Sequence, residues 1–226
     1  MRKYLQRIYD KKEEKNIDSY KDVFEKYIKE QYNCDYKEYL ERLSKYNVAI
    51  IISVSHFLKY YEEEFADLNK SYSQLSMFRI VALQSAIETV IGFPVNDYSR
   101  RTEACIYKFF NDNLSVDEKN KIINSVKFFK DEQEIRKNNL YLFVKFILES
   151  RNGFVHRAQL FYFDVGTDIV FSNRYHKGKK IGEVSCALNY YDYSSIVKKA
   201  ILRYLLNKKR NLQQSMVLRK NKKKKK

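Results

Sequence analysis

Three residues at the end of an apolar segment have the types and the spacing needed for acid–base chemistry on a phosphate. The hexapeptide from Arg151 to His156 reads R-N-G-F-V-H, so an arginine, a carboxamide at Asn152 and a histidine fall within about one and a half helical turns. Histidine exchanges protons near neutral pH. A guanidinium binds phosphate through a planar fork of donors and stabilises charge on it. These side chains suffice for cleavage of RNA without a metal ion.

Helix geometry limits how these residues can act together. Asn152 and His156 are four positions apart and share one helix face. Arg151 and His156 are five positions apart, which is about 140° around an ideal helix, so one straight helix does not aim both side chains at one point. Either Gly153 loosens the helix, or two copies of the chain each contribute part of one cleft. The second arrangement suits a phosphate that lies between paired basic side chains.

The elements that carry the hexapeptide are predicted to be helical. The chain has only 5 Gly and 1 Pro, whereas a sheet-rich fold needs more turn residues. Apolar residues recur at three- and four-residue spacing, which is typical of helices with one buried face. Ser115 and Glu118 have the spacing of a capping box, and Gly92 is expected to end a helix. We expect helices over residues 36–67, 72–91, 98–112, 115–130, 134–157 and 191–206.

A small hairpin is expected between the last two helices. Short β-like runs occupy residues 160–164, 168–173 and 181–187, and glycines separate them. The predicted fold class is therefore all-α, a helical bundle with a small β-hairpin insertion over residues 160–188 before the last helix.

Basic side chains are concentrated at the carboxyl end. The formal net charge is +16, and residues 208–226 carry 10 Lys and Arg and no acid. We expect this tail to be disordered and to attract nucleic acid without sequence preference. The alternative is a tail that only keeps the protein soluble.

The composition argues against several other classes. Cys34, Cys105 and Cys186 are isolated, so no disulfide framework is implied. Three dispersed His and three dispersed Cys give no metal-ligand spacing, and we expect neither a metal nor a cofactor. The amino-terminal segment lacks an apolar signal core, and the longest apolar run, Val48 to Val54, is far shorter than the ~20 residues that span a bilayer. These features predict a soluble cytoplasmic protein without a membrane contact.

Several chemistry-bearing residues also have a purely structural interpretation. Arg151 could simply bind carbonyl groups at the end of its helix. Glu88 is interpreted as a structural acid that pairs with Arg79 or Arg151 rather than as a proton shuttle. His56 lies in a predicted core helix and is expected to be an interior histidine with its hydrogen bonds satisfied. His176 lies in a lysine-rich segment and is expected at a loop surface.

The order of the helices and the hexapeptide resemble the HEPN superfamily, the all-helical domain of many prokaryotic ribonuclease toxins and antiviral effectors. Arg151, Asn152 and His156 match the family's R-N/D/H-x-x-x-H motif. The A-x-E at Ala86 to Glu88 resembles the family's acid in the second helix. The resemblance covers roughly residues 45–207.

The resemblance implies an activity and a set of roles. The chain would be a metal-independent endoribonuclease that acts as a toxin or antiphage effector, with two motifs facing each other in a homodimer. His156 would move the proton, Arg151 would stabilise the charged transition state, and Asn152 would orient His156 or the phosphate. The products would be a 2′,3′-cyclic phosphate and a 5′-hydroxyl, and DNA would be spared because it lacks the attacking hydroxyl.

The resemblance also defines domains, partners and departures. We expect a helical extension over residues 1–45, the HEPN-like domain over 46–207 and the basic tail over 208–226. RNA is the expected partner, together with a possible antitoxin or a second protein of a defence complex. Some relatives carry a Tyr two positions after the His, where this chain has Ala158, so pairing with a modifying nucleotidyltransferase is not implied. Further RNA contacts are expected from Arg157, Arg174, Lys177, Lys179 and Lys180.

Two other functions stay open at this point. The chain could be a catalytically inactive RNA-binding or regulatory module, as the basic tail and the many aromatic residues would allow. It could also be a structural partner in a defence complex, with the tail as an interaction arm.

Overall fold

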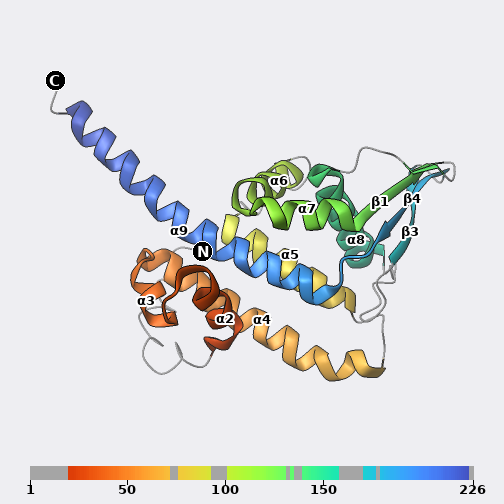
Figure 1. Ribbon diagram of the computed structural model, residues 1–226, viewed down its shortest axis with the longest axis horizontal. Helices are drawn as coiled ribbons and strands as arrows, with labels where there is room; N and C mark the ends of the chain where they lie inside the picture. Colours follow the sequence, from red (N-terminus) through yellow and green to blue (C-terminus); the bar gives the residue numbers. More distant parts are fainter. Residues whose placement is uncertain are drawn as a thin grey trace.

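The computed structural model describes residues 20–71, 76–92, 101–130, 133–134, 139–157, 170–176 and 179–223, with side chains for residues 20–61, 79–92, 102–129, 133–134, 139–152 and 187–208. These residues form a mainly helical body with one antiparallel sheet at its end (Figure 1). The helices are α2 (Asp22–Tyr32), α3 (Tyr36–Glu41), α4 (Lys45–Ser71), α5 (Ser76–Ile91), α6 (Arg101–Asn113), α7 (Val116–Ser125), α8 (Leu140–Arg157) and α9 (Tyr190–Lys223), and the strands are β1 (Val126–Lys130), β2 (Gln133–Glu134), β3 (Val170–His176) and β4 (Lys179–Cys186).

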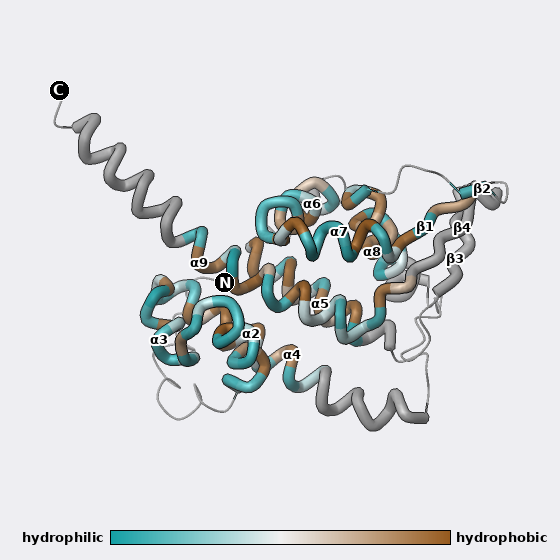
Figure 2. The backbone as a smooth tube through the Cα atoms, viewed as in Figure 1, coloured by the Kyte–Doolittle hydropathy of each residue, from teal (hydrophilic) through white to brown (hydrophobic). Residues whose placement is uncertain are grey.

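Helix α5 is the centre of the body. It contacts α4, α6, α8 and α9, and its small side chains Ala82 and Ala86 are buried. Gly92 follows it with φ of 77° and donates its N–H to the Glu88 carbonyl, so the predicted glycine ends the helix. Most of α5 is buried, whereas hydrophilic and hydrophobic residues alternate along the helices that surround it (Figure 2).

Aromatic side chains join the helices around the end of the body that holds α8. The Phe110 ring of α6 lies 6.4 Å from the Phe143 ring of α8, which lies 5.8 Å from the Tyr193 ring of α9. Phe110 and Phe143 are almost completely buried. These edge-to-face contacts fix how α8 is rotated about its own axis, and that rotation decides where its polar residues point.

The predicted helix over residues 36–67 is two helices, which corrects the sequence expectation. Arg42 and Leu43 donate to carbonyls three residues earlier, which is a tighter turn than an α-helix allows. The Ser44 hydroxyl then accepts from the Asn47 N–H and starts α4. The Tyr39 hydroxyl of α3 donates to the Leu202 carbonyl of α9 at 2.6 Å, so the described part of the expected extension, 20–45, packs into the same core as the other helices.

The predicted helix over residues 115–130 is also shorter than expected. It starts at the predicted capping box of Ser115 and Glu118, which is confirmed, but it ends at Ser125. Residues 126–130 form β1, in which Val126 and Phe128 are buried and Lys127 between them is exposed. This alternation is the strand period of two, and it outweighs the helical spacing of the preceding residues.

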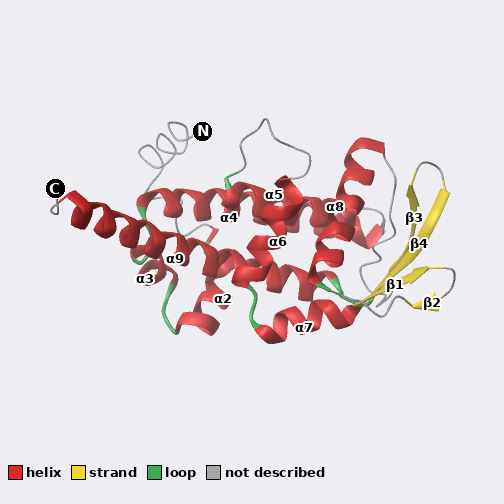
Figure 3. Cartoon of the chain, turned by 90° about the horizontal axis from the view of Figure 1, so that it is seen from above, coloured by secondary structure: helices red, strands yellow, loops and turns green. Residues whose placement is uncertain are grey.

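The sheet is larger than the predicted hairpin. Strands β3 and β4 form the expected antiparallel pair within residues 160–188, before the last helix, and their pairing contains a β-bulge between Arg174 and Tyr175. Strand β1 pairs with β4, and β2 pairs with β1, which gives the order β2-β1-β4-β3. Figure 3 shows this sheet at one end of the helical body. The predicted helical fold with a hairpin before the last helix is therefore confirmed, and β1 and β2 extend that hairpin to a four-stranded sheet. The predicted β-like run 160–164 lies outside the described residues.

The last helix extends beyond its predicted end at residue 206. It continues to Lys223 and projects away from the body at the end opposite the sheet (Figures 1 and 3). The backbone of residues 208–223 is therefore helical, whereas the sequence predicts a disordered tail. Good helix formers such as Lys, Arg, Leu and Gln occupy this segment, and no Gly or Pro interrupts it.

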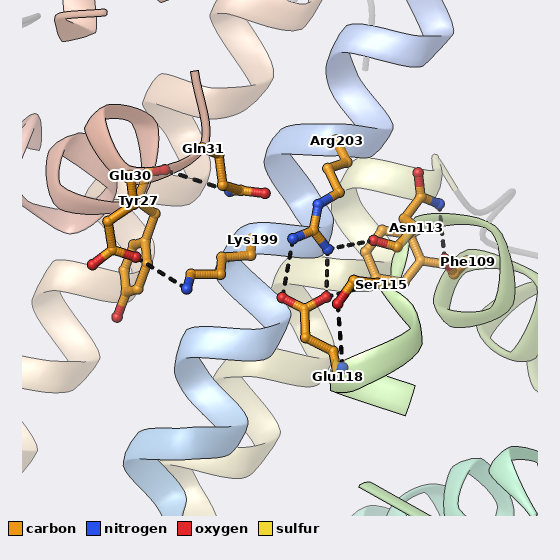
Figure 4. A network of polar contacts seen from close by, with 9 residues as sticks. All are labelled: Tyr27, Glu30, Gln31, Phe109, Asn113, Ser115, Glu118, Lys199 and Arg203. Atoms are coloured by element: carbon orange, nitrogen blue, oxygen red, sulfur yellow. Dashed lines mark hydrogen bonds and ion pairs between the residues drawn. The ribbon is translucent and has the colours of Figure 1, made fainter. Parts of the chain in front are cut away.

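An ion pair attaches α9 to the start of α7. The Arg203 guanidinium binds both oxygens of Glu118, with Nη2 at 3.0 Å from Oε1, and its Nη1 also donates to the Asn113 carbonyl at 2.8 Å. Figure 4 shows these contacts beside the Ser115 cap, together with the separate pair of Lys199 and Glu30. A bidentate ion pair of this kind fixes both the distance between the two helices and their orientation.

The capping box gives a testable contribution to stability. Ser115→Ala removes the side-chain acceptor of the Glu118 N–H, and we expect the free energy of unfolding to fall by about 1 kcal/mol. The melting temperature should fall by about 2–4 °C. Asn120→Ala, at an exposed position of the same helix, is the control and should change stability by less than about 0.5 kcal/mol. Equal melting temperatures for Ser115→Ala and the wild type would show that the cap is not needed.

Candidate functional site

The end of α8 carries two stripes of side chains with different surroundings. Leu140, Val144 and Ile147 form a buried stripe, and Arg151, at its next position, reaches Glu88 of α5. Tyr141, Lys145, Leu148 and Asn152 form the neighbouring stripe, which borders α6. Since the aromatic contacts fix the rotation of α8, Arg151 is directed toward the central helix and Asn152 toward an open groove.

Arg151 is held by an acid on α5. Its Nη2 lies 3.3 Å from Oε2 of Glu88, and its Nη1 donates to Oδ1 of Asn152 at 3.0 Å. The side chains of Arg151 and Glu88 are only 18% and 17% exposed. The predicted pairing of Glu88 with Arg151 is therefore confirmed, and Arg79, the other predicted partner, lies over the Tyr190 ring instead.

The surroundings of Glu88 perturb its protonation. Burial raises the pKa of the Glu88 carboxyl, and the positive charge of Arg151 and the Gln84 amide only partly offset that effect. The Gln84 side chain is completely buried one helical turn before Glu88. Oε1 of Glu88 and Nε of Arg151 are buried without hydrogen-bond partners among the described residues. The pair thus contains two buried polar atoms whose hydrogen-bonding capacity is unused among the described residues.

A small open pocket of about 120 Å³ lies at this end of the groove between α6 and α8. Arg151 and Asn152 form one side of it, so two of the three predicted catalytic residues line one cavity. Sequence reasoning missed the remaining lining residues. Thr102 and Glu103 are brought to the pocket by packing of α6 on α8. Lys145, Leu148 and Glu149 precede the motif on α8 itself.

The charges around the pocket nearly cancel. Lys145 and Arg151 are basic, whereas Glu103 and Glu149 are acidic, and Nζ of Lys145 lies 4.0 Å from Oε1 of Glu149. Glu88 adds a further carboxylate behind Arg151. In one chain, the Arg151 guanidinium still has N–H groups that can donate to a phosphate, but the net positive potential around the pocket is small.

Helix α8 runs without interruption through Gly153 to Arg157. The backbone therefore does not loosen at Gly153, and the first of the two arrangements considered for Arg151 and His156 is not the one present. His156 keeps its place five positions after Arg151 on a regular helix, about 140° away around the axis. The side chain of His156 lies outside the described side chains. The same holds for the side chains of Arg157, Arg174, Lys179 and Lys180, and Lys177 as a whole lies outside the described residues.

Two histidines lie elsewhere than predicted, and the first, His176, is the last residue of strand β3 rather than part of a loop. His56 is exposed on α4, with its ring 4.8 Å from the Tyr20 ring, so the expectation of an interior histidine was wrong. The apolar run on α4 contains the buried Val54, Ser55 and Leu58, and His56 falls on the opposite face of the same helix. Helical spacing around this position could have identified that face.

No group of three His, Cys, Asp or Glu side chains that could hold a metal ion occurs among the described residues. Within the same part of the chain, no helix is long and apolar enough to cross a membrane. Comparisons with protein-family models, with curated proteins and with solved structures give no match to this chain. Its function must therefore be argued from the site.

The raised pKa of Glu88 predicts how a substitution depends on pH. The folded state binds a proton at Glu88 more readily than the unfolded chain, so this contribution to stability is lost as pH rises from 4.5 through the raised pKa. Glutamine does not titrate. In urea unfolding, Glu88→Gln should therefore gain stability relative to the wild type between pH 4.5 and neutral pH. A free-energy difference that stays constant over this range would contradict the perturbation.

Proposed function

We propose that this chain is a metal-independent endoribonuclease of the HEPN type, working as a homodimer in which Arg151, Asn152 and His156 of both chains line one RNA cleft. The observation that carries the proposal is the fixed Arg151. Its guanidinium forms an ion pair with Glu88 and donates a hydrogen bond to Asn152. Arg151 also lines an open pocket at the end of the motif helix. An arginine whose only task was to bind the last carbonyls of its helix would not need these contacts.

Each motif residue has a distinct part in the proposed reaction. His156 deprotonates the ribose 2′-hydroxyl or protonates the leaving 5′-oxygen. Arg151 donates from its remaining N–H groups to the phosphate oxygens, where negative charge develops in the transition state. The 2′-oxygen attacks the phosphorus, the bond to the 5′-oxygen breaks, and a 2′,3′-cyclic phosphate and a 5′-hydroxyl remain. Glu88 positions Arg151 and does not touch the substrate.

Two properties of the single chain favour a dimer. Arg151 and His156 lie about 140° apart on an uninterrupted helix, so one chain does not direct both at the same phosphate. The pocket also has nearly balanced charge, and a second copy would bring a second Arg151 to the same substrate. A two-fold axis beside the end of α8 satisfies both requirements. The proposed role is that of a toxin or antiphage effector, in which an antitoxin or a second defence protein would restrain the cleavage.

Mixed dimers test this arrangement. Arg151→Ala and His156→Ala are each expected to be inactive alone. When the two variants are co-expressed, a heterodimer contains one intact pair, Arg151 from one chain and His156 from the other, and RNA cleavage should return. Cleavage that stays absent in purified heterodimers, while a wild-type chain paired with either variant is active, would show that both residues act within one chain.

The helical arm favours a second candidate, an RNA-binding module without turnover. Residues 208–223 continue α9 away from the body and carry Lys and Arg without an acid. Such an arm attracts the phosphate backbone irrespective of sequence. In this case deletion of residues 208–226 would abolish RNA binding, and His156→Ala would leave both binding and the RNA unchanged.

A further inference from the structure

Gln84 is a polar residue in the apolar part of α5. Its side chain is completely buried, and Ile80, Leu83 and Ile87 at neighbouring positions are almost completely buried as well. Neither Nε2 nor Oε1 of Gln84 completes a hydrogen bond of normal geometry with a described residue. A buried amide in that state costs free energy that an apolar side chain of similar volume would not. Packing alone therefore does not explain the amide at this position.

The amide lies close to the carboxylate that holds Arg151. Gln84 precedes Glu88 by one helical turn, so the two residues share a face of α5. The amide lowers the pKa of the Glu88 carboxyl, against the larger effect of burial. Helices α4, α6, α8 and α9 contact α5, and among their described residues Arg151 of α8 is the charged group that also shifts this pKa. Glu88 thus has two polar neighbours, one amide and one guanidinium.

The ion pair of Glu88 and Arg151 does not fix the carboxylate by itself. Nη2 of Arg151 lies 3.3 Å from Oε2 of Glu88, whereas Oε1 is buried without a hydrogen-bond partner among the described residues. A bidentate pair would set the orientation of both groups, but this pair uses one oxygen. The orientation of the carboxylate must therefore also depend on its other polar neighbour, which is Gln84.

We propose that Gln84 is a positioning residue of the proposed nuclease, whose buried amide keeps Glu88 ionised and oriented so that Glu88 directs the Arg151 guanidinium toward the pocket. The inference rests on the proposed function, because Arg151 acts on RNA only in that function. Gln84 does not touch the substrate itself, since its side chain is completely buried.

The rate of cleavage as a function of pH tests this role. Gln84→Met keeps a side chain of similar length and removes the amide. We expect kcat for RNA cleavage in EDTA to fall by about 10–100-fold at mildly acidic pH, with little change in KM, because the guanidinium is misplaced for the transition state. Without the amide, Glu88 binds a proton more readily and no longer holds Arg151, so the defect should shrink as pH rises. An effect of packing alone would be the same at every pH.

Urea unfolding measures the same contact without RNA. Removal of the amide should raise the pKa of Glu88 in the folded state further, and the stability that a raised pKa contributes is lost as pH rises from 4.5. The free energy of unfolding of Gln84→Met relative to the wild type should therefore decrease between pH 4.5 and neutral pH. In a Glu88→Gln background, the same substitution should have an effect that does not depend on pH.

Asn47 provides a matched control. It is also a buried amide, 1% exposed, but it lies on α4 and donates to the Leu205 carbonyl of α9 at 2.7 Å. Asn47→Leu should lower the melting temperature and leave cleavage by the folded protein unchanged. Gln84→Leu is the second apolar replacement, to be used if Gln84→Met does not fold.

The outcomes separate this inference from the proposed function. Equal kcat of Gln84→Met and the wild type at every pH would show that the amide does not position Arg151. A loss of kcat that does not depend on pH, or an equal loss in Asn47→Leu, would assign the effect to packing. If the wild type does not cleave RNA but the pH-dependent difference in stability is present, the proposed function fails and the hold of Gln84 on Glu88 is supported. If the wild type cleaves RNA and Gln84→Met changes neither readout, the reverse holds.

Discussion

His156→Ala is expected to lower the rate of RNA cleavage in EDTA by about 10²–10⁴-fold, the contribution of a positioned acid–base group. The result follows from the proposed role of His156 as the only motif residue that titrates near neutral pH. Cleavage would be followed with a labelled RNA and purified protein, and circular dichroism would confirm that the variant is folded.

A matched control is available within the same chain. His56 is an exposed histidine on α4 whose ring is tilted against that of Tyr20, so His56→Ala removes the same side chain at a surface distant in sequence from the motif. It should cleave RNA as fast as the wild type. Arg151→Lys should also lose most activity, by about 10²-fold, because an ammonium cannot reproduce the planar fork toward both Glu88 and a phosphate. Unchanged cleavage by His156→Ala would contradict the assignment.

Breaking the pair of Arg203 and Glu118 is expected to have the largest effect on stability. Their side chains are 25% and 14% exposed, and Arg203→Ala leaves the Glu118 carboxylate half-buried and the Asn113 carbonyl without its donor. We expect a loss of about 2–4 kcal/mol, somewhat less than for a fully buried pair. In a chain of this size that lowers the melting temperature by about 5–15 °C.

The exposed pair of Lys121 and Asp192 provides the comparison. It also connects α7 to α9, at 2.8 Å, but its side chains are 51% and 38% exposed. Lys121→Ala should therefore cost less than about 1 kcal/mol, because solvent screens such pairs. If both substitutions lowered the melting temperature equally, burial would not be what makes the Arg203 pair important.

The pair also predicts the acid sensitivity of the fold. Burial alone would raise the pKa of Glu118, but the hydrogen bonds from Arg203 and Ser115 outweigh it and hold that pKa below its usual range. The stabilisation is therefore present above pH 4.5 and is lost as pH falls through the lowered pKa. In Glu118→Gln the free energy of unfolding should fall less steeply with acid than in the wild type. The effect runs opposite to that of Glu88, whose contribution is lost as pH rises.

Local signals in the sequence predicted the helix ends that depend on neighbouring residues. The capping box of Ser115 and Glu118 and the glycine end at Gly92 involve groups within four residues of each other, so spacing alone identifies them. Strand β1 was missed because its partner, β4, lies more than fifty residues later in the chain. Only pairing with that strand makes the run V-K-F-F-K extended rather than helical.

The residues of the candidate site also fall into those that the sequence could identify and those that it could not. Arg151 and Asn152 could be identified because they are adjacent in the sequence. Arg151 was also one of the two partners that charge suggested for Glu88. Glu103 and Thr102 could not be identified. They come from α6, and no local pattern tells which face of α6 packs against α8. Their contribution to the pocket is a result of tertiary packing.

The ends of the cleaved RNA test the central claim most directly. Purified protein would be incubated with RNA in EDTA, and the fragments would be analysed by mass spectrometry. The proposed mechanism predicts fragments that end in a 2′,3′-cyclic phosphate and begin with a 5′-hydroxyl, and no cleavage of DNA of the same sequence. Fragments with 3′-hydroxyl and 5′-phosphate ends that form only when Mg²⁺ is added, or intact RNA under both conditions, would contradict it.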